Sequence, residues 1–360
     1  MSAGRFRAFM DVGRVQGVGV TAAIAILGSL SASAGPGLVD LFWLVVISIF
    51  AHMGGAALNE LWDRRLDSAV PELARKPLVS GAVSTSEAKV LIAVATPLSL
   101  VLAAIIFGIP AFIAILIATL WMHWYCTAGK RTFIVNDFSQ CVGFGAYALF
   151  GTLSVGSPTM LTWPLVGVVA TLNLFAQWGN SLKDADYDGR FGIPSLAVRT
   201  GVSSARGLGW RHPYFIFGAA IKSAFLFFCT LPILIADVPL AYVFIVVALG
   251  YPVQYFTLHE FLGPKTRSRY VKLLLGDLLL SYPAAAAISI INAGLAGLLL
   301  LAAFVFGGYM LGSALQSGAE FKFRGSLATG RPADSQKTQG RFYMRGNPIM
   351  TSWLAKVAGR

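Results

Sequence analysis

Charged side chains are scarce in this sequence of 360 residues, in which Asp, Glu, Lys and Arg make up 12% and apolar residues 56%. Soluble domains usually carry about a quarter charged residues. Together with a mean hydropathy of +0.70, this scarcity excludes an ordinary soluble domain and predicts a chain that crosses a membrane several times. Gly and Pro are spread along long apolar runs, which favours transmembrane helices over the short alternating strands of a barrel.

Cysteines and acids are also few. The three cysteines, Cys126, Cys141 and Cys229, show no paired spacing, which argues against a disulfide framework. The net charge is +12 because 28 Lys and Arg face only 16 Asp and Glu. In a chain this apolar, basic loops are explained by membrane topology and anionic headgroups, so we expect contact with membrane lipids and no nucleic-acid partner.

Apolar runs long enough to cross a bilayer occur ten times along the chain. They cover residues 15–33, 39–58, 88–108, 110–127, 137–156, 162–180, 213–235, 238–258, 271–290 and 294–315. The predicted fold is therefore all-α, a polytopic transmembrane helical bundle of nine or ten helices. The lower number applies if the stretch from 271 to 315 is one broken element.

The basic residues predict the orientation of this bundle. Apart from Lys222, all Lys and Arg lie in or next to six segments. These are the segment before the first run, the connections between runs 2 and 3, 4 and 5, 6 and 7, and 8 and 9, and the segment after the last run. By the positive-inside rule, both termini and these connections are expected on the cytoplasmic side of an integral, multi-pass membrane protein. Residues 1–315 form the predicted transmembrane domain, and residues 316–360 a basic cytoplasmic tail, partly disordered.

Two groups of polar residues repeat with the same spacing. Each group has an Asn followed by two Asp at four-residue intervals, and the second group follows the first by 121 residues: Asn59, Asp63 and Asp67, then Asn180, Asp184 and Asp188. Residues four apart share one helix face. Because the second and sixth predicted helices run in the same direction, both motifs are expected at the cytoplasmic mouth, facing each other across a cavity.

Facing carboxylates repel one another, so a cation is expected between them. Magnesium fits, because it takes one or two carboxylates and completes its shell with water and substrate phosphates. Basic residues near the motifs are candidates to bind a diphosphate: Arg64, Arg75, Lys76, Lys130, Arg131, Lys183 and Arg190. A diphosphate at the mouth of an apolar cavity points to an isoprenyl diphosphate substrate.

Aromatic residues near the same helix ends could stabilise an allylic carbocation or belong to the interfacial belt: Trp62, Trp121, Trp124, Tyr125, Trp178 and Tyr187. For His52 and His123, each within a predicted helix, a hydrogen-bonded packing role is favoured over catalysis. Lys222 and Asp277 lie deeper in the membrane, where charge is costly and usually paired or functional.

The motifs resemble those of the UbiA-type intramembrane prenyltransferase superfamily. Residues 59–67, "NELWDRRLD", are similar to its N-D-x-x-D-x-x-x-D box, with Glu60 where the family usually has Asp. Residues 75–84, "RKPLVSGAVS", are similar to the segment that follows this box, with Lys76 in place of the usual Arg. Residues 183–201, "KDADYDGRFGIPSLAVRTG", resemble the second box, with Asp186 as an additional acid. Residues 124–132, "WYCTAGKRT", resemble the family's Tyr and Lys-Arg loop.

The resemblance implies magnesium-dependent transfer of a polyprenyl group from an isoprenyl diphosphate to a second substrate inside the membrane. That acceptor would be an aromatic compound, a quinone precursor, a pigment or a lipid. Asp63, Asp67, Asp184 and Asp188 are the predicted catalytic residues and metal ligands. Asn59 is a further ligand or orienting group, as is Asn180, and the extra acids Glu60 and Asp186 are secondary ligands.

Two alternatives stay open at this stage. A terpene cyclase with the same fold would quench the carbocation internally and need no acceptor. An ion transporter also places acids in repeated transmembrane helices, although its sites usually lie near the membrane midplane and often come from inverted repeats.

Overall fold

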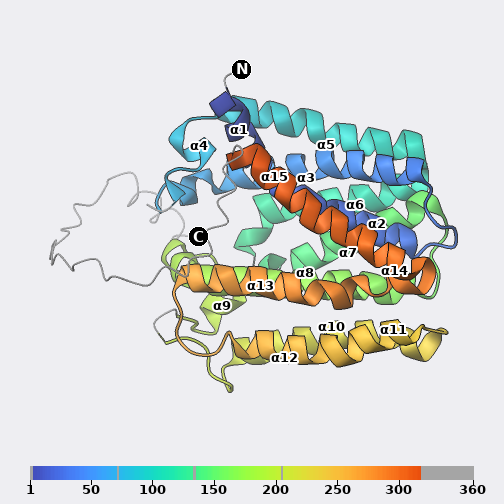
Figure 1. The fold of residues 1–360 in the computed structure, drawn as a ribbon. Coiled ribbons are helices and arrows are strands. Elements are labelled where there is room, and N and C mark those ends of the chain that lie inside the picture. The colour runs from blue at the N-terminus through green and yellow to red at the C-terminus, as the bar shows by residue number, and fades with distance from the viewer. Residues whose placement is uncertain (1–2, 71–72, 133–134, 204–205, 318–360) are drawn as a thin grey trace, which may run out of the picture. The chain divides into compact units, whose positions relative to one another are not determined.

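Figure 1 shows a computed structural model of the chain, which describes residues 3–70, 73–132, 135–203 and 206–317. The predicted tail therefore lies, from residue 318 onward, outside the described residues. Helices make up nearly all of the described part, and its β-bridges are isolated ones. In chain order the elements are α1 (Ala3–Val12), η1 (Val15–Gly17), α2 (Val18–Leu30), α3 (Leu38–Asp67), α4 (Pro77–Ser80), α5 (Thr85–Phe107), α6 (Ile109–Thr127), η3 (Gly129–Arg131), α7 (Val135–Val155), α8 (Thr162–Phe191), α9 (Leu196–Arg199), α10 (Pro213–Ile235), α11 (Leu240–Val243), η4 (Phe244–Gly250), α12 (Tyr251–His259), α13 (Arg267–Ala286), α14 (Ser289–Ala302), η5 (Ala303–Gly307) and α15 (Gly308–Ser317).

The all-α membrane fold predicted from the sequence is confirmed. In the described residues, seven helices are long and apolar enough to span a membrane, and there are eight if the bent pair Gly4–Val12 and Val15–Leu30 is one span. Two further predicted runs fall on α8 and α13, which are too polar to meet that criterion. In α8 the polar residues include Asn173 and Gln177, and α13 carries three basic residues and Asp277. The number of crossings, nine or ten, stays a prediction.

The last two predicted runs are separate elements in the structure. α13 leads away from the end of the bundle where α1 and α4 lie, and α14 to α15 returns to it (Figure 1). Gly294 makes the reversal possible, because its φ of 59° lies in the left-handed region that favours glycine.

Small residues let α2 and α7 cross closely. A Cβ added at Gly151 would lie 1.9 Å from the carbonyl oxygen of Ala25, and one at Gly28 would lie 2.0 Å from that of Ala148. Close backbone approach of this kind is typical of membrane helices, where packing replaces the hydrophobic effect as the main source of association. The crossing fixes α2 beside the helices that carry the site.

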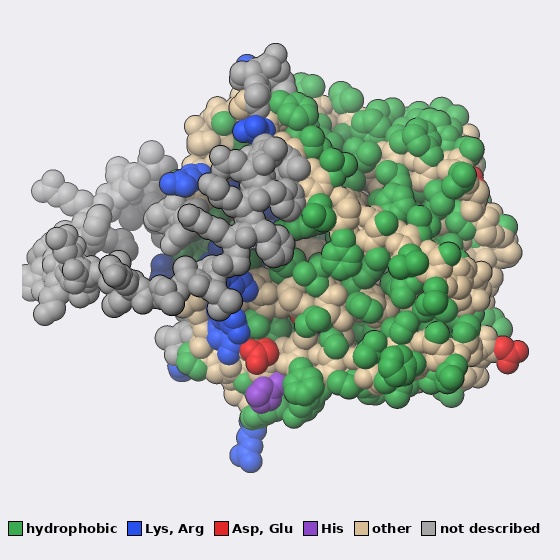
Figure 2. All heavy atoms as spheres, viewed as in Figure 1, with side chains coloured by type: hydrophobic (Ala, Val, Ile, Leu, Met, Phe, Trp, Pro, Cys, Tyr) green, Lys and Arg blue, Asp and Glu red, His purple; other side chains and the backbone are tan. Residues whose placement is uncertain are grey.

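The surface divides by polarity. Figure 2 shows hydrophobic side chains over most of the visible face, with Lys and Arg gathered at one end. α3 and α8, each 30 residues long, both end at this basic end of the bundle (Figure 1). The two polar motifs, which occupy the last turns of α3 and α8, therefore lie at the same end of the molecule.

A charged pair lies inside the bundle, away from that end. Lys222 of α10 donates to Asp277 of α13 and, at 2.5 Å, to the side-chain oxygen of Gln254 of α12. The Lys222 ammonium also lies 3.9 Å from the centre of the Phe175 ring. Both charged side chains are almost completely buried. The sequence placed both charges within the membrane, where such residues are usually paired or functional, and in the structure they pair with each other.

This pair gives a stability prediction. We expect Asp277→Leu to destabilise the protein by about 3 kcal/mol, because it leaves the Lys222 ammonium buried without its counter-ion. The double variant Lys222→Met with Asp277→Leu should recover most of that loss, since it removes both charges. Thermal unfolding in detergent measures both effects. An Asp277→Leu protein that melts at the wild-type temperature would contradict the prediction.

Candidate active site

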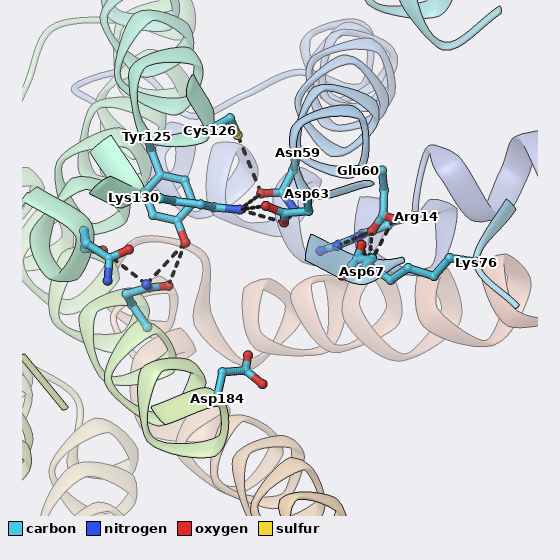
Figure 3. A network of polar contacts seen from close by, with 12 residues as sticks. Arg14, Asn59, Glu60, Asp63, Asp67, Lys76, Tyr125, Cys126, Lys130 and Asp184 are labelled. Carbon is cyan, nitrogen blue, oxygen red and sulfur yellow. Dashed lines mark hydrogen bonds and ion pairs between the residues drawn. The ribbon is translucent and has the colours of Figure 1, made fainter. Parts of the chain in front are cut away.

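The first motif is organised around Lys130. The ammonium of Lys130, which follows α6, donates at 2.7 Å to the side-chain oxygen of Asn59 and at 2.7 Å to each carboxylate oxygen of Asp63. Asn59 in turn donates to Asp63 at 3.0 Å, one helical turn away. Figure 3 shows Lys130 extended between Tyr125 and the Asn59 and Asp63 side chains. A cation thus offsets the charge of Asp63 in this state.

Glu60 and Asp67 have a different set of partners. Glu60 is buried and accepts hydrogen bonds from Arg14, at the break between α1 and α2, and from Lys76. Lys76 also donates to Asp67 at 2.8 Å. Two cations therefore hold Glu60 on a side of α3 separate from the Lys130 contacts (Figure 3). The role of Glu60 as a secondary metal ligand stays a prediction, and the geometry supports a structural ion pair.

The second motif lies on the last turns of α8. Asp184 accepts from Lys183 at 2.5 Å and from Arg267, at the start of α13, at 2.9 Å. Burial raises the pKa of Asp188 to about 7, and the charge of Asp184 acts in the same direction, whereas Lys183 and a hydrogen bond from Ser195 lower that pKa. Asp188 is therefore close to half-protonated at neutral pH.

The two motifs line one connected space. An outer cavity of about 160 Å³ is lined by Asp188, Tyr187 and Asn136 among others. An inner cavity of about 460 Å³ extends along α3 past Asn59 as far as His52. Both cavities share Tyr125 and several residues of the two motifs and their cations: Asp63, Asp67, Asn180, Asp184, Lys130 and Arg267. The structure therefore brings together all six residues of the repeated motif.

The basic residues predicted to bind a diphosphate divide into two sets. Lys76, Lys130 and Lys183 line the inner cavity. In the described part of the chain, neither cavity's lining includes the others: Arg64, Arg75, Arg131 and Arg190. The side chain of Arg64 donates to the carbonyl of Leu78 at 2.8 Å instead. The diphosphate-binding role of these four arginines stays a prediction that the geometry does not support.

The remaining predicted residues also separate. Asp186 is absent from both cavity linings of the described residues, so its role as a secondary ligand stays a prediction. Of the six aromatic residues, Tyr125 and Tyr187 line the cavities, whereas Trp62 and Trp124 are exposed, as the interfacial belt requires. Trp178 is buried and stacked on Phe175.

Two basic residues that line the inner cavity escaped the sequence reasoning, namely Arg14 and Arg267. Each is a basic residue close before a predicted helix on the cytoplasmic side, and this position is the only signal that the sequence offers. Arg267 pairs with Asp184 although 83 positions separate them. A contact between residues so far apart in the sequence cannot be predicted from local residue spacing.

The oxygen-rich lining fits magnesium. Among residues 3–317, as far as the structure describes them, no group of three or more His, Cys, Asp or Glu side chains could hold a metal ion by protein ligands alone. Magnesium does not require such a cage, since one or two carboxylates suffice when phosphates and water supply the other ligands. Carboxylate and amide oxygens from two helices facing a water-accessible cavity are a donor set of this kind.

Comparison with known proteins decides the family. Residues 19–275 match the model of the UbiA prenyltransferase family. The chain belongs to this family. A digeranylgeranylglyceryl phosphate synthase from Korarchaeum cryptofilum is 28% identical over 212 residues, which cover 55% of this chain and 69% of that protein. A 4-hydroxybenzoate octaprenyltransferase from Yersinia pseudotuberculosis is 28% identical over 174 residues, which cover 47% of this chain and 59% of that protein.

The UbiA fold is shared with solved structures. A UbiA homolog from Archaeoglobus fulgidus, determined bound to GPP and Mg²⁺, superposes with a TM-score of 0.59 at 16% sequence identity. The match covers 77% of this chain and 99% of that one. The family resemblance that the motifs suggested is thus confirmed, and the protein is a membrane-embedded prenyltransferase of the UbiA family. Membership in this family also leaves the ion-transporter alternative without support.

Proposed function

We propose that this UbiA-family enzyme transfers a polyprenyl group from an isoprenyl diphosphate to an acceptor inside the membrane, with Mg²⁺ as cofactor and the site on the cytoplasmic side. The observation that carries the proposal is the shared lining of one cavity by Asp63, Asp67, Asp184 and Asp188. Four carboxylates around one space suit a metal-bound diphosphate, because Mg²⁺ takes one or two carboxylates and completes its shell with phosphate oxygens and water.

The carboxylates and amides of the two motifs would hold the metal, with Asp63 and Asp67 on one wall and Asp184 and Asp188 on the other. When bound, Mg²⁺ would supply positive charge that stabilises the departing diphosphate. Lys130 lies where it could turn from Asp63 to a phosphate oxygen, because its ammonium is a mobile point charge on a flexible stem. Such pre-placed charge lowers the barrier to breaking the allylic C–O bond.

The inner cavity would take the prenyl chain. Small or apolar residues of α3 and α6 line it, including Ala51, Gly55, Ala56, Ala118 and Met122. Tyr125 is buried beside Lys130, with its ring 5.2 Å from the ammonium, and its aromatic face could stabilise positive charge on the allylic carbon. A prenyl chain that fills the cavity would displace water from around that carbon, which would protect a carbocation from hydrolysis.

The names of the relatives include one lipid product and one aromatic acceptor, and the proposal accommodates both acceptor classes. The test is to incubate purified protein with Mg²⁺, geranylgeranyl or farnesyl diphosphate and a lipid extract of the host. We expect diphosphate release and a product heavier than the prenyl chain by mass spectrometry. A bare cyclic hydrocarbon or alcohol would indicate a terpene cyclase, and no diphosphate release with any chain length would refute the proposal.

Asp188 gives a pH prediction. Because its pKa is about 7, this carboxyl is mostly protonated at pH 6 and mostly ionised at pH 8, and a metal ion must displace the proton. We therefore expect the Mg²⁺ concentration for half-maximal diphosphate release to fall about tenfold from pH 6 to pH 8. Asp188→Asn should raise the Mg²⁺ concentration for half-maximal release at every pH and remove most of its dependence on pH. If this concentration still fell tenfold from pH 6 to pH 8 in Asp188→Asn, another group would have to be responsible for the pH dependence.

A further inference from the structure

A polar corner lines the inner cavity on the N-terminal side of the first Asp motif along α3. It consists of Thr21 of α2, His52 of α3 and the backbone carbonyl of Arg14, and all three residues line the cavity. The Thr21 hydroxyl lies 2.7 Å from Nδ1 of His52, and Nε2 of the same ring lies 3.1 Å from the Arg14 carbonyl oxygen. The diphosphate site does not use this corner, so its role needs a separate explanation.

The hydrogen bonds define what the histidine can do. A carbonyl oxygen only accepts, so Nε2 must carry the hydrogen, and in the neutral ring Nδ1 is then the acceptor. The Thr21 hydroxyl therefore donates to Nδ1, and its own lone pairs can still accept a hydrogen bond. The Arg14 carbonyl also stabilises the ring when it gains a proton at Nδ1. The corner is thus a chain of groups that can take up one proton from the cavity.

The backbone is arranged to hold this ring. Arg14 adopts a left-handed conformation, with φ of 46° and ψ of 47°, and among the described residues it is the one non-glycine residue with positive φ. Strained positions of this kind are often found at functional sites. Gly17 leaves room for the imidazole, because a Cβ there would lie 2.7 Å from a ring carbon of His52. These two features hold the ring in one position at the edge of the cavity.

We propose that this corner, formed by Thr21, His52 and the Arg14 carbonyl, binds the hydroxyl group of the acceptor and takes up its proton during prenyl transfer. The inference rests on the proposed function and makes it more specific, because it commits to an alcohol as the acceptor class and to an ether as the product. It also differs from the packing role that the sequence favoured for His52.

The position of the corner suits such an acceptor. His52 precedes Asn59 by seven residues, so it lies about 10 Å farther along α3 from the first motif. A diphosphate held at Asp63 and Asp184 would direct its allylic carbon into the space between. An acceptor hydroxyl bonded to Thr21 would then approach that carbon from the side away from the departing diphosphate.

The step balances as follows. The C–O bond between the allylic carbon and the diphosphate breaks, and its electron pair leaves with the diphosphate. A lone pair of the acceptor oxygen forms the new C–O bond. The acceptor proton passes to the Thr21 oxygen while the Thr21 proton passes to Nδ1 of His52. The resulting imidazolium returns its proton to the released diphosphate or to water when the products leave.

The experiment uses the full-length protein in detergent with Mg²⁺ and geranylgeranyl diphosphate. The acceptor probes are a geranylgeranyl monoether of glyceryl phosphate with one free hydroxyl, its O-methylated analogue, and 4-hydroxybenzoate. His52→Gln is the decisive variant, since the amide can donate to the Arg14 carbonyl and accept from Thr21 but cannot take up a proton. We expect it to lower kcat with the monoether about 10²-fold, with unchanged KM for the monoether.

Other variants separate chemistry from structure. Thr21→Val should lower kcat to a similar extent, and Thr21→Ser should restore it. Added imidazole should partly rescue His52→Ala but not His52→Gln. The matched control is Thr171→Val, because that buried hydroxyl donates within its own helix, to the carbonyl of Gly167 at 2.7 Å. It should transfer at the wild-type rate.

Two kinds of failure can be told apart. Wild-type transfer rates in His52→Gln would overturn this inference and leave the proposed function intact. The same holds if the wild-type protein prenylates a carbon atom of 4-hydroxybenzoate and does not react with the monoether. The O-methylated analogue should give no product, and a product from it would also overturn the inference. Absence of Mg²⁺-dependent diphosphate release by the wild type with every acceptor would refute the proposed function itself.

Discussion

Asp63→Ala is expected to lower Mg²⁺-dependent prenyl transfer by about 10³-fold or more, while the protein stays folded. The carboxylate is a proposed metal ligand on one wall of the cavity, and its loss weakens binding of the Mg²⁺ that would stabilise the departing diphosphate. The variant also leaves Lys130 without its counter-ion, so an unbalanced positive charge remains in the cavity. The measurement is the initial rate of diphosphate release at saturating Mg²⁺.

The control for this variant lies on the same helix. Asp40 is at the opposite end of α3, where its carboxylate accepts from the backbone nitrogen of Gly37 at 2.8 Å. Asp40→Asn should keep wild-type activity with a small loss of helix stability. If Asp63→Ala retained full activity and an unchanged unfolding temperature, the assignment of Asp63 as a metal ligand would be wrong.

Lys130→Gln is expected to have two effects of opposite sign. Transfer should slow by about 10²- to 10³-fold, because the cation that would bind the diphosphate is lost. Binding of Mg²⁺ to the enzyme without substrate should become tighter, because the ammonium that lies 2.7 Å from both oxygens of Asp63 no longer competes with the metal. Calorimetric titration with Mg²⁺ and steady-state rates measure the two effects separately.

Arg131 provides the matched comparison. It adjoins Lys130 in sequence, but it is exposed and absent from both cavity linings of the described residues. Arg131→Gln should leave Mg²⁺ affinity and transfer close to the wild-type values. If Arg131→Gln lost most of its transfer rate and Lys130→Gln lost little, Arg131 rather than Lys130 would be the cation that binds the diphosphate.

Periodicity and repetition carried most of what could be predicted. The apolar runs identified the helices because a bilayer demands about twenty apolar residues in succession. The four-residue spacing of Asn59, Asp63 and Asp67 placed them on one helix face, and the recurrence of this spacing 121 residues later predicted a shared site. The apolar runs and the four-residue spacing are local patterns, and the second motif repeats one of them, so all of these features can be recognised in the sequence alone.

Contacts between distant segments could not be predicted in the same way. Neither Arg14 beside Glu60 nor Arg267 beside Asp184 follows from any spacing, because each pair forms only when separate helices pack. The direction of a side chain in the last turn of a helix is equally hidden: Arg64, near the end of α3, was expected at the diphosphate but donates to the carbonyl of Leu78. The sequence predicted that basic residues lie near the motifs, but which of these residues line the cavity depends on the tertiary structure.

The central claim is that both Asp motifs hold one Mg²⁺-bound diphosphate, and equilibrium binding of geranylgeranyl thiolodiphosphate, an analogue that resists cleavage, tests it most directly. Affinity would be measured for the wild type, Asp63→Ala, Asp184→Ala and the double variant, each with and without Mg²⁺. The account predicts that binding of the analogue requires Mg²⁺ and that either single variant loses most of the affinity for the analogue. The double variant should lose little more affinity, because the motifs act on the same ligand. Binding that is independent of Mg²⁺, or that survives loss of either motif, would contradict the account.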